Sequence, residues 1–271
     1  VLLPTATAPP PGMPRLGPAN PLAWWLLDRA MARAGRPLDD VLARAGSAQR
    51  GLPLFRARSP LLHVVACSPS IIRVAPDLPQ GAVVTGAWID RSPAEALPDA
   101  LEAYLADGSP PVVVTFGSMR GLPPEELRAA VDRLLASGLR VVAQGSLGDG
   151  AASRGLLPIG AVDHRALFGR AAIVVHHGGA GTTHAVAAAG VPSVVVPHVG
   201  DQRYWADRLL GLGVAARPLK LDGISADGLA EAVRVAVADP AMRDAAHALA
   251  ARVSAEDGVG ATIALLERFA A

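Results

Sequence analysis

From about residue 90 onward, short apolar runs alternate with longer segments in which apolar positions recur at helical spacing. The runs are rich in valine and isoleucine and are bounded by glycine or proline, which is typical of buried parallel strands. Such alternation predicts an α/β fold with a doubly wound parallel sheet. We expect strands over 112–116, 139–144, 157–160, from 173, 193–197 and 214–217, and helices over 94–107, from 123, 165–170, 184–190, 204–211 and in three closing segments ending with 260–269.

The first part of the chain has a different pattern. Seven prolines between residues 4 and 21 predict an extended or irregular segment. After it we expect a helix over 22–35, a second short helix after Pro37 and Asp39, and strands over 61–67 and 82–85. This part lacks a recognisable start for a sheet of its own. We therefore predict that residues 1–88 are the tail of an N-terminal domain plus a linker, and that 89–271 are a C-terminal Rossmann-like domain.

The strand from Ile173 runs directly into a glycine-rich turn, His177-Gly-Gly-Ala-Gly-Thr-Thr183. An alanine-rich segment follows the turn and is stopped by Gly190, as a short helix would be. A strand, a glycine turn and a helix together expose backbone N–H groups at a positive helix end, which attracts phosphate above all. Histidine and threonine side chains at the turn add hydrogen-bond donors. The stretch therefore predicts a cradle for a diphosphate.

A second glycine turn is expected to meet the first one. In the strand order 3-2-1-4-5-6, the first and fourth strands are neighbours, and ligands bind beyond their carboxyl ends. Here the first strand ends in Gly117-Ser118 and the fourth ends in His176-His177-Gly178. Both turns would then line one crevice, which favours a nucleotide site.

Composition and charge exclude several other classes of protein. The formal charge is +1 and Lys220 is the only lysine, which argues against a nucleic-acid surface. A single cysteine, Cys67, excludes an internal disulfide and fits a reducing cytoplasm. The apolar runs are too short for a membrane span. The sequence begins at Val1 without a signal-peptide pattern, as a fragment or a processed product would.

Other nucleotide chemistries lack their motifs. A P-loop needs a lysine that neither turn has, and the G-x-G-x-x-G pattern of dinucleotide enzymes is not supplied by residues 117–121. No G-x-S-x-G elbow offers a hydrolase nucleophile. Five of the seven histidines lie between His164 and His198, but no H-E-x-x-H motif or cysteine pair accompanies them. We expect no metal and no cofactor.

Three motifs resemble the donor-site signature of nucleotide-sugar glycosyltransferases of the GT-B fold: His177–Thr183, Gly190-Val-Pro192 and Pro197-His-Val-Gly-Asp201-Gln202. Val114-Thr-Phe-Gly-Ser118 is similar to the first-strand loop of that family, and Thr85-Gly-Ala-Trp88 resembles the entry into its linker. The similarity is greatest to the bacterial natural-product and antibiotic branch and to sterol glucosyltransferases. It implies an inverting enzyme that moves a hexose from a UDP- or TDP-sugar to a hydroxyl of a small lipophilic acceptor such as a macrolide or sterol.

The resemblance also implies roles for single residues. The donor diphosphate would be bound by Ser118, His177, Gly178, Gly179, Gly181, Thr182 and Thr183, with His177 stabilising the leaving group. Asp201 and Gln202 would bind hydroxyls of the hexose, and Val162 would pair with the base through its backbone. The aromatic residue and the acid that the plant branch uses are replaced by Ile159 and Ala185, so base stacking and ribose recognition are solved otherwise here, as in the bacterial branch.

The catalytic base is not among these residues. The family carries it as a histidine near the start of its N-terminal domain, and His63, the only histidine before residue 164, does not match that motif. We therefore expect this chain to bind donor but to be catalytically incomplete by itself. The helix with Trp24 and Trp25 would lack the sheet it should pack on, which favours self-association.

Other interpretations of these residues stay open. The chain as a whole fits a non-catalytic nucleotide-sugar-binding module or partner subunit, and an epimerase of the same fold, although Asp201-Gln202 favours the transferase. His177 is also compatible with a purely structural role, and Asp201 and Ser118 are compatible with roles as helix caps. We expect His176 and His184 to be structural.

Overall fold

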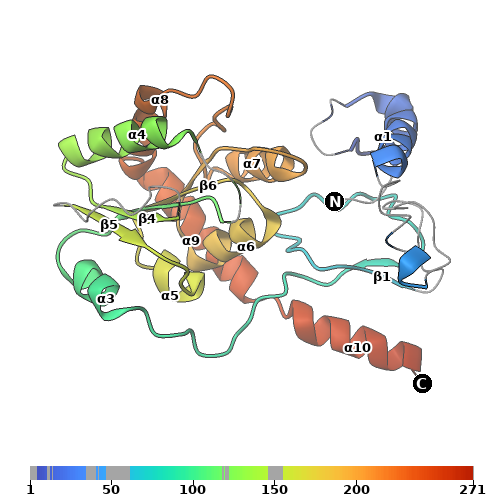
Figure 1. Cartoon of the computed structure of the whole chain (residues 1–271). Helices are drawn as coiled ribbons and strands as arrows, with labels where there is room; N and C mark the ends of the chain where they lie inside the picture. Colours follow the sequence, from blue (N-terminus) through green and yellow to red (C-terminus); the bar gives the residue numbers. More distant parts are fainter. Residues whose placement is uncertain are drawn as a thin grey trace.

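The computed structural model describes residues 5–10, 13, 15–34, 41, 43–46, 62–117, 119, 122–145 and 155–270. Its centre is a five-stranded parallel sheet in the order β5-β4-β3-β6-β7 (Figure 1). In chain order this is 3-2-1-4-5, so the predicted doubly wound sheet is confirmed. The strands are β3 (Val112–Thr115), β4 (Val141–Gln144), β5 (Leu156–Ile159), β6 (Ile173–His176) and β7 (Ser193–Val195).

The predicted sixth strand over 214–217 is wrong. The segment reaches the correct edge of the sheet, but it forms only an isolated parallel bridge between Ser193 and Ala215. Hydrogen bonds from Ala216 N to Ser193 O and from Leu219 N to Val195 O continue the contact. Pro218 lies between them and has no N–H to donate, so a regular ladder cannot form there.

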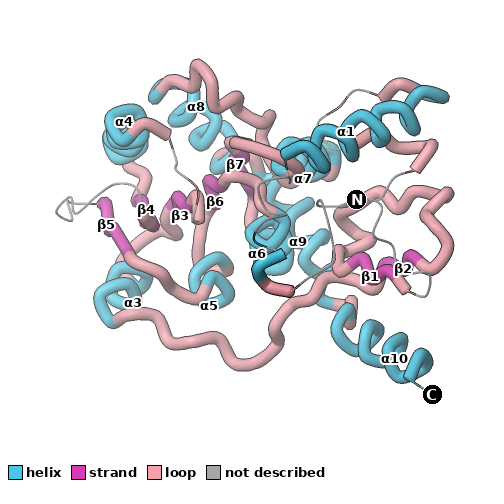
Figure 2. Tube along the Cα trace, turned by 45° about the vertical axis from the view of Figure 1, so that its right-hand side comes forward, coloured by secondary structure: helices cyan, strands magenta, loops and turns pink. Residues whose placement is uncertain are grey.

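Helices cover both faces of this sheet. They are α3 (Asp99–Ala106), α4 (Pro124–Ala136), α5 (His164–Phe168), α6 (Ala180–Ala189), α7 (Gln202–Gly211), α8 (Ala226–Val237) and α9 (Pro240–Ser254). The last helix, α10 (Gly258–Ala270), extends away from the sheet (Figure 1). In Figure 2, α4 and α8 lie on one side of the strands and α3 and α5 on the other. The helix expected over 94–107 begins only at Asp99, because Pro98 has no N–H for the preceding turn. The helix expected from 184 begins four residues earlier, at Ala180.

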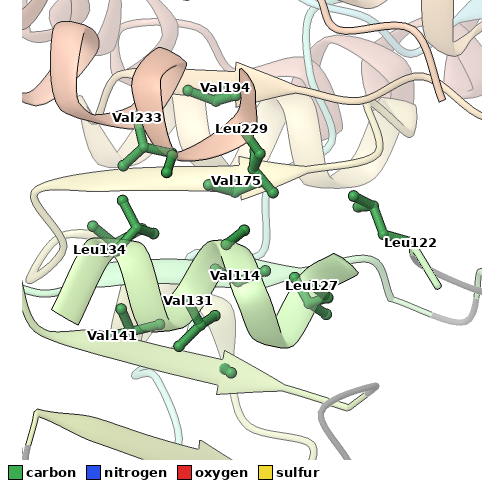
Figure 3. Close-up of a cluster of buried hydrophobic side chains, with 14 of the residues drawn as sticks. Val114, Leu122, Leu127, Val131, Leu134, Val141, Val175, Val194, Leu229 and Val233 are labelled. Carbon is green, nitrogen blue, oxygen red and sulfur yellow. The ribbon is translucent and has the colours of Figure 1, made fainter. Parts of the chain in front are cut away.

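The alternation of side chains along β3 explains why its sequence is apolar throughout. Val112 and Val114 join the cluster under α4 and α8, whose members interlock in Figure 3. Val113 points to the opposite cluster, with Leu101 of α3 and Phe168 of α5. A parallel strand that is buried on both faces shows no polar alternation. The core therefore holds β3 and β6 rigidly, and their carboxyl ends carry the site.

The first part contains η1 (Gly17–Ala19), α1 (Asn20–Ala34) and a separate parallel pair, β1 (His63–Val65) with β2 (Ala82–Val84). Trp24 is buried, and its indole donates a hydrogen bond to Ala8 O at 2.8 Å, whereas Leu22, Trp25 and Leu26 on the same helix are exposed. Part of the second short helix that we predicted lies outside the described residues.

Residues 62–88 pack on the C-terminal half. Ile71 and Ile72 are buried in a cluster with Trp205 of α7 and Leu249 of α9. The Arg208 guanidinium also donates to Ile71 O at 2.7 Å. The domain boundary at residue 88 stays a prediction. No helix in the described part of the chain is long and apolar enough to cross a membrane.

Candidate functional site

The two glycine turns meet at the carboxyl ends of β3 and β6. Thr115 of β3 is in register with His176 of β6, so the residues that follow leave the sheet side by side. Gly117 has a φ of +59°, and a Cβ built on it would lie 3.5 Å from Cε1 of His177. The backbone of the first turn therefore faces the imidazole of the second, as the strand order predicts.

The turn after β6 requires glycine at position 178, directly after His177. Gly178 has a φ of +84°, and a Cβ there would lie 2.8 Å from Cγ1 of Val195 and 3.0 Å from the carbonyl oxygen of Gln202. Both the left-handed backbone and the close approach of the β7 segment exclude a side chain. Gly181 is different, because a Cβ there would meet nothing within 4 Å. The turn is packed on one side and open at the start of α6.

The amino end of α6 is a ready site for an anion. Its N-cap is Gly179, which offers no side-chain cap, so the first-turn N–H groups rely on other partners. The helix dipole adds partial positive charge at this end. Thr182 is half-buried, whereas the Thr183 side chain is fully buried and its hydroxyl has no partner among the described residues. A phosphate at this helix end would reach Thr182 first.

His177 lies between the two turns. It is half-buried, and its Nδ1 is buried without a hydrogen-bond partner in the described part of the structure. Burial lowers the pKa of His177, and the nearby His198 lowers it further, while the Asp201 carboxylate partly offsets both effects. The imidazole is therefore neutral at pH 7 in the free protein and can donate one hydrogen bond.

His176 and His184 are structural, which confirms our expectation. His176 is fully buried, and its Nδ1 accepts the Gly178 N–H at 3.1 Å while its Nε2 donates to the Ser193 hydroxyl at 3.2 Å. Burial lowers the pKa of His176 to about 3, so the ring stays neutral and holds the glycine turn. His184 accepts the Ser68 N–H at 3.1 Å and donates to Ala180 O at 2.7 Å.

Asp201 ends the loop that follows β7, and Gln202 is the first residue of α7. Asp201 does not cap α7 with its side chain, so that alternative is wrong; its carboxylate accepts the Trp205 indole N–H at 2.8 Å. The Gln202 side-chain oxygen accepts backbone N–H groups of His198 at 2.6 Å and Val199 at 3.0 Å. These bonds fix the loop, and within the described ranges the other Asp201 oxygen and the Gln202 amide N–H groups form no further hydrogen bond. Their contacts with a hexose stay predictions.

A surface pocket of about 350 Å³ lies beside this loop. Residues from two segments line it: Pro197, His198, Val199, Gly200 and Arg203 from the β7–α7 region, and Leu219, Lys220, Leu221 and Asp222 from the segment before α8. The pocket opens next to the residues that we expect to bind the sugar.

Val162 stands in the loop before α5, with its side chain packed on the α3–α5 cluster. The next residue, Asp163, accepts the Arg165 N–H at 2.9 Å and caps α5. Arg165 forms ion pairs with Asp163 at 2.7 Å and with Asp90 at 3.1 Å. The loop expected to receive the base is thus fastened to the segment just after the predicted linker.

Ser118, our remaining candidate for a phosphate contact, lies outside the described residues. His198 was missed as a site residue by sequence reasoning. Its ring centroid lies 6.4 Å from that of His177. The signal that was available was its position inside the Pro197–Gln202 motif. Within the described ranges, no group of three or more His, Cys, Asp or Glu side chains is placed to hold a metal.

The arrangement defines the C-terminal half of a GT-B glycosyltransferase, and solved structures agree. The glycotransferase of kitacinnamycin superposes with a TM-score of 0.64 at 23% identity, over 88% of this chain and 62% of that one. CalG4, the calicheamicin glycosyltransferase, superposes with a TM-score of 0.62 at 22% identity, over 86% of this chain and 59% of that one. At this identity the likeness shows the fold.

The family follows from the sequence match: residues 122–263 match the family described as erythromycin biosynthesis protein CIII-like, C-terminal domain, and the chain belongs to it. O-mycaminosyltylonolide 6-deoxyallosyltransferase of Streptomyces fradiae is 37% identical over 96% of this chain and 63% of its own length. Vancomycin aglycone glucosyltransferase of Amycolatopsis orientalis is 45% identical over 56% of this chain and 38% of its own. A sterol 3-beta-glucosyltransferase of Saccharomyces cerevisiae is 32% identical over 76% of this chain and 18% of its own length. The chain thus spans less than two thirds of these relatives.

Proposed function

We propose that the protein is an inverting glycosyltransferase, and that this chain carries its donor site. The donor is a UDP- or TDP-hexose, and the acceptor is a hydroxyl of a small lipophilic molecule. The observation that carries the proposal is the meeting of two glycine turns around His177 at the uncapped start of α6. The choice of acceptor is supported by the relatives named for transfer to O-mycaminosyltylonolide, to the vancomycin aglycone and to sterols.

The chemistry follows from where charge develops. The bond between the anomeric carbon and the phosphate oxygen breaks as the acceptor oxygen attacks from the opposite face, and negative charge accumulates on the leaving diphosphate. Donors fixed in advance around that diphosphate stabilise the transition state more than the ground state. His177, Thr182 and the first N–H groups of α6 would supply these donors. The acceptor proton passes to a general base that we place outside the residues assigned here.

The first experiment measures donor binding. Titration calorimetry with UDP, TDP and their hexose conjugates is run with EDTA and with added Mg²⁺. We expect binding without a divalent metal, because histidine, hydroxyl and helix N–H groups form the cradle. A strict requirement for Mg²⁺ or Mn²⁺ would contradict a metal-free cradle.

The second experiment measures transfer. Donor turnover with a phenolic or sterol acceptor is compared between this chain and a version extended upstream. We expect turnover by the extended version and none by this chain, since a positioned general base alone contributes about 10²–10⁴-fold. Robust turnover by the 271-residue chain would refute the assignment of the base.

A non-catalytic nucleotide-sugar-binding module is the second candidate. Donor binding without turnover by the extended version would favour that module.

A further inference from the structure

His198 is held in one orientation at the crevice. Its Nδ1 lies 2.7 Å from Val196 O, so this nitrogen carries the proton and donates. Its backbone N–H donates to the Gln202 side chain at 2.6 Å, and the Phe116 ring packs against the imidazole at a centroid distance of 5.4 Å. In the neutral ring Nε2 is then an unprotonated acceptor.

His198 meets His177 edge to face. Their ring planes cross at 84° with centroids 6.4 Å apart. Each ring has one buried nitrogen without a hydrogen-bond partner among the described residues, Nδ1 in His177 and Nε2 in His198. A buried polar atom without a partner is costly unless a ligand or water satisfies it. The two unsatisfied nitrogens lie on adjacent rings at the end of the crevice that should receive a diphosphate.

The charges around the pair suit an anion that arrives from outside. On the β7–α7 segment, Asp201 favours a protonated His177, and Arg203 is occupied by an ion pair with Asp207 at 3.0 Å. From the segment before α8, Lys220 and Asp222 line the same pocket as His198 and carry opposite charges.

The described neighbours therefore do not supply enough negative charge to offset the effect of burial on the pKa of His177. Burial and mutual proximity lower the pKa of His177, and Phe116 adds only an apolar ring. A diphosphate between the two turns would bring negative charge to this point and reverse the balance, because an opposite charge within a few ångströms favours the charged form of histidine.

We propose that His198 is a further donor-site residue, which forms with His177 a pair of imidazoles that takes up one proton as the diphosphate of the nucleotide sugar binds. This inference rests on the proposed function and adds the coupling of donor binding to protonation. The sign follows directly: the bound state holds one proton more than the free protein, so binding tightens as the pH falls.

The test is calorimetry of the whole chain with UDP-glucose and TDP-glucose. A nucleotide sugar is the better probe because the terminal phosphate of a free diphosphate itself titrates near pH 6. Enthalpies in two buffers of different ionisation enthalpy give the number of protons taken up. Between pH 6 and 8 we expect uptake of about one proton. The Kd should then fall by up to about tenfold for each unit by which the pH is lowered.

His198→Asn is the matched variant. The asparagine amide replaces Nδ1 as donor to Val196 O but cannot titrate, so the loop is kept while the proton site is lost. We expect proton uptake to fall below half of the native value and the pH dependence to flatten. His247→Asn makes the same change on the exposed surface of α9 and should leave the proton uptake and the pH dependence of binding unchanged.

Each outcome decides something. Binding without proton uptake by the native chain refutes the pair but leaves the donor site standing. Full proton uptake by His198→Asn assigns the proton to another group and also refutes it. No binding at any pH refutes the proposed function and the pair together.

Discussion

Replacing His177 with alanine removes a side chain that lies between the two glycine turns. The imidazole faces the backbone of Gly117, is half-buried and has an unsatisfied Nδ1 among the described residues. A hydrogen bond from it to a phosphate oxygen would be charge-assisted, and such bonds contribute about 1.5–3 kcal/mol. At about 1.4 kcal/mol per decade, His177→Ala should raise the Kd of UDP roughly 10- to 150-fold.

The assay is titration calorimetry with UDP and with uridine. Uridine lacks the diphosphate, so its affinity should be almost unchanged by His177→Ala. His247→Ala on the exposed part of α9 serves as control, and thermal unfolding checks that the variant remains folded. An equal loss of affinity for uridine and UDP would show that His177 only supports the turn, and would refute the cradle.

Two further predictions separate sugar binding from support of the fold. Asp201→Ala should weaken the binding of a UDP-hexose roughly tenfold or more while leaving the affinity for UDP nearly unaffected at pH 8, because a carboxylate bonded to a hydroxyl acts only on the sugar. Asp201→Asn can still accept the Trp205 indole N–H and therefore serves as the control for the fold. Equal losses of affinity for both ligands would contradict the assignment. Gly178→Ala should destabilise the chain by about 2–5 kcal/mol in denaturant unfolding, from left-handed strain and overpacking against Val195. Gly181→Ala, whose Cβ would meet open space, should not destabilise it, and equal effects would disprove the packing argument.

Sheet order and strand positions were largely predictable because they depend on local patterns. Valine-rich runs bounded by glycine and proline located β3 and β6, and burial on both faces leaves such runs apolar throughout. Element ends were predicted less well. Pro98 delays the start of α3, and Pro218 reduces the sixth strand to a bridge. Each of these two differences depends on whether a single backbone N–H is available.

Contacts between distant residues could not be predicted in the same way. His184 pairs with the backbone of Ser68, which lies 116 positions earlier, and Arg165 fastens the base loop to Asp90. Sequence spacing carries no information on such pairs, because they form only when the segment 62–90 packs against helices α5 and α6. The structural reading of His184 was correct, but its partner became visible only in the folded chain.

By itself the sequence determined the kind of site. The turn His177–Thr183 is continuous, so its glycines, hydroxyls and helix end are set by local backbone rules and predict a phosphate cradle wherever the strand is placed. Only the tertiary structure decided which groups share the crevice. Gly117 and His198 come from the ends of β3 and β7, and they approach His177 because those strands flank β6 in the sheet. Whether an imidazole nitrogen has a partner, and therefore which histidines are left for a ligand, depends on that packing, since hydrogen bonds are satisfied by neighbours in space.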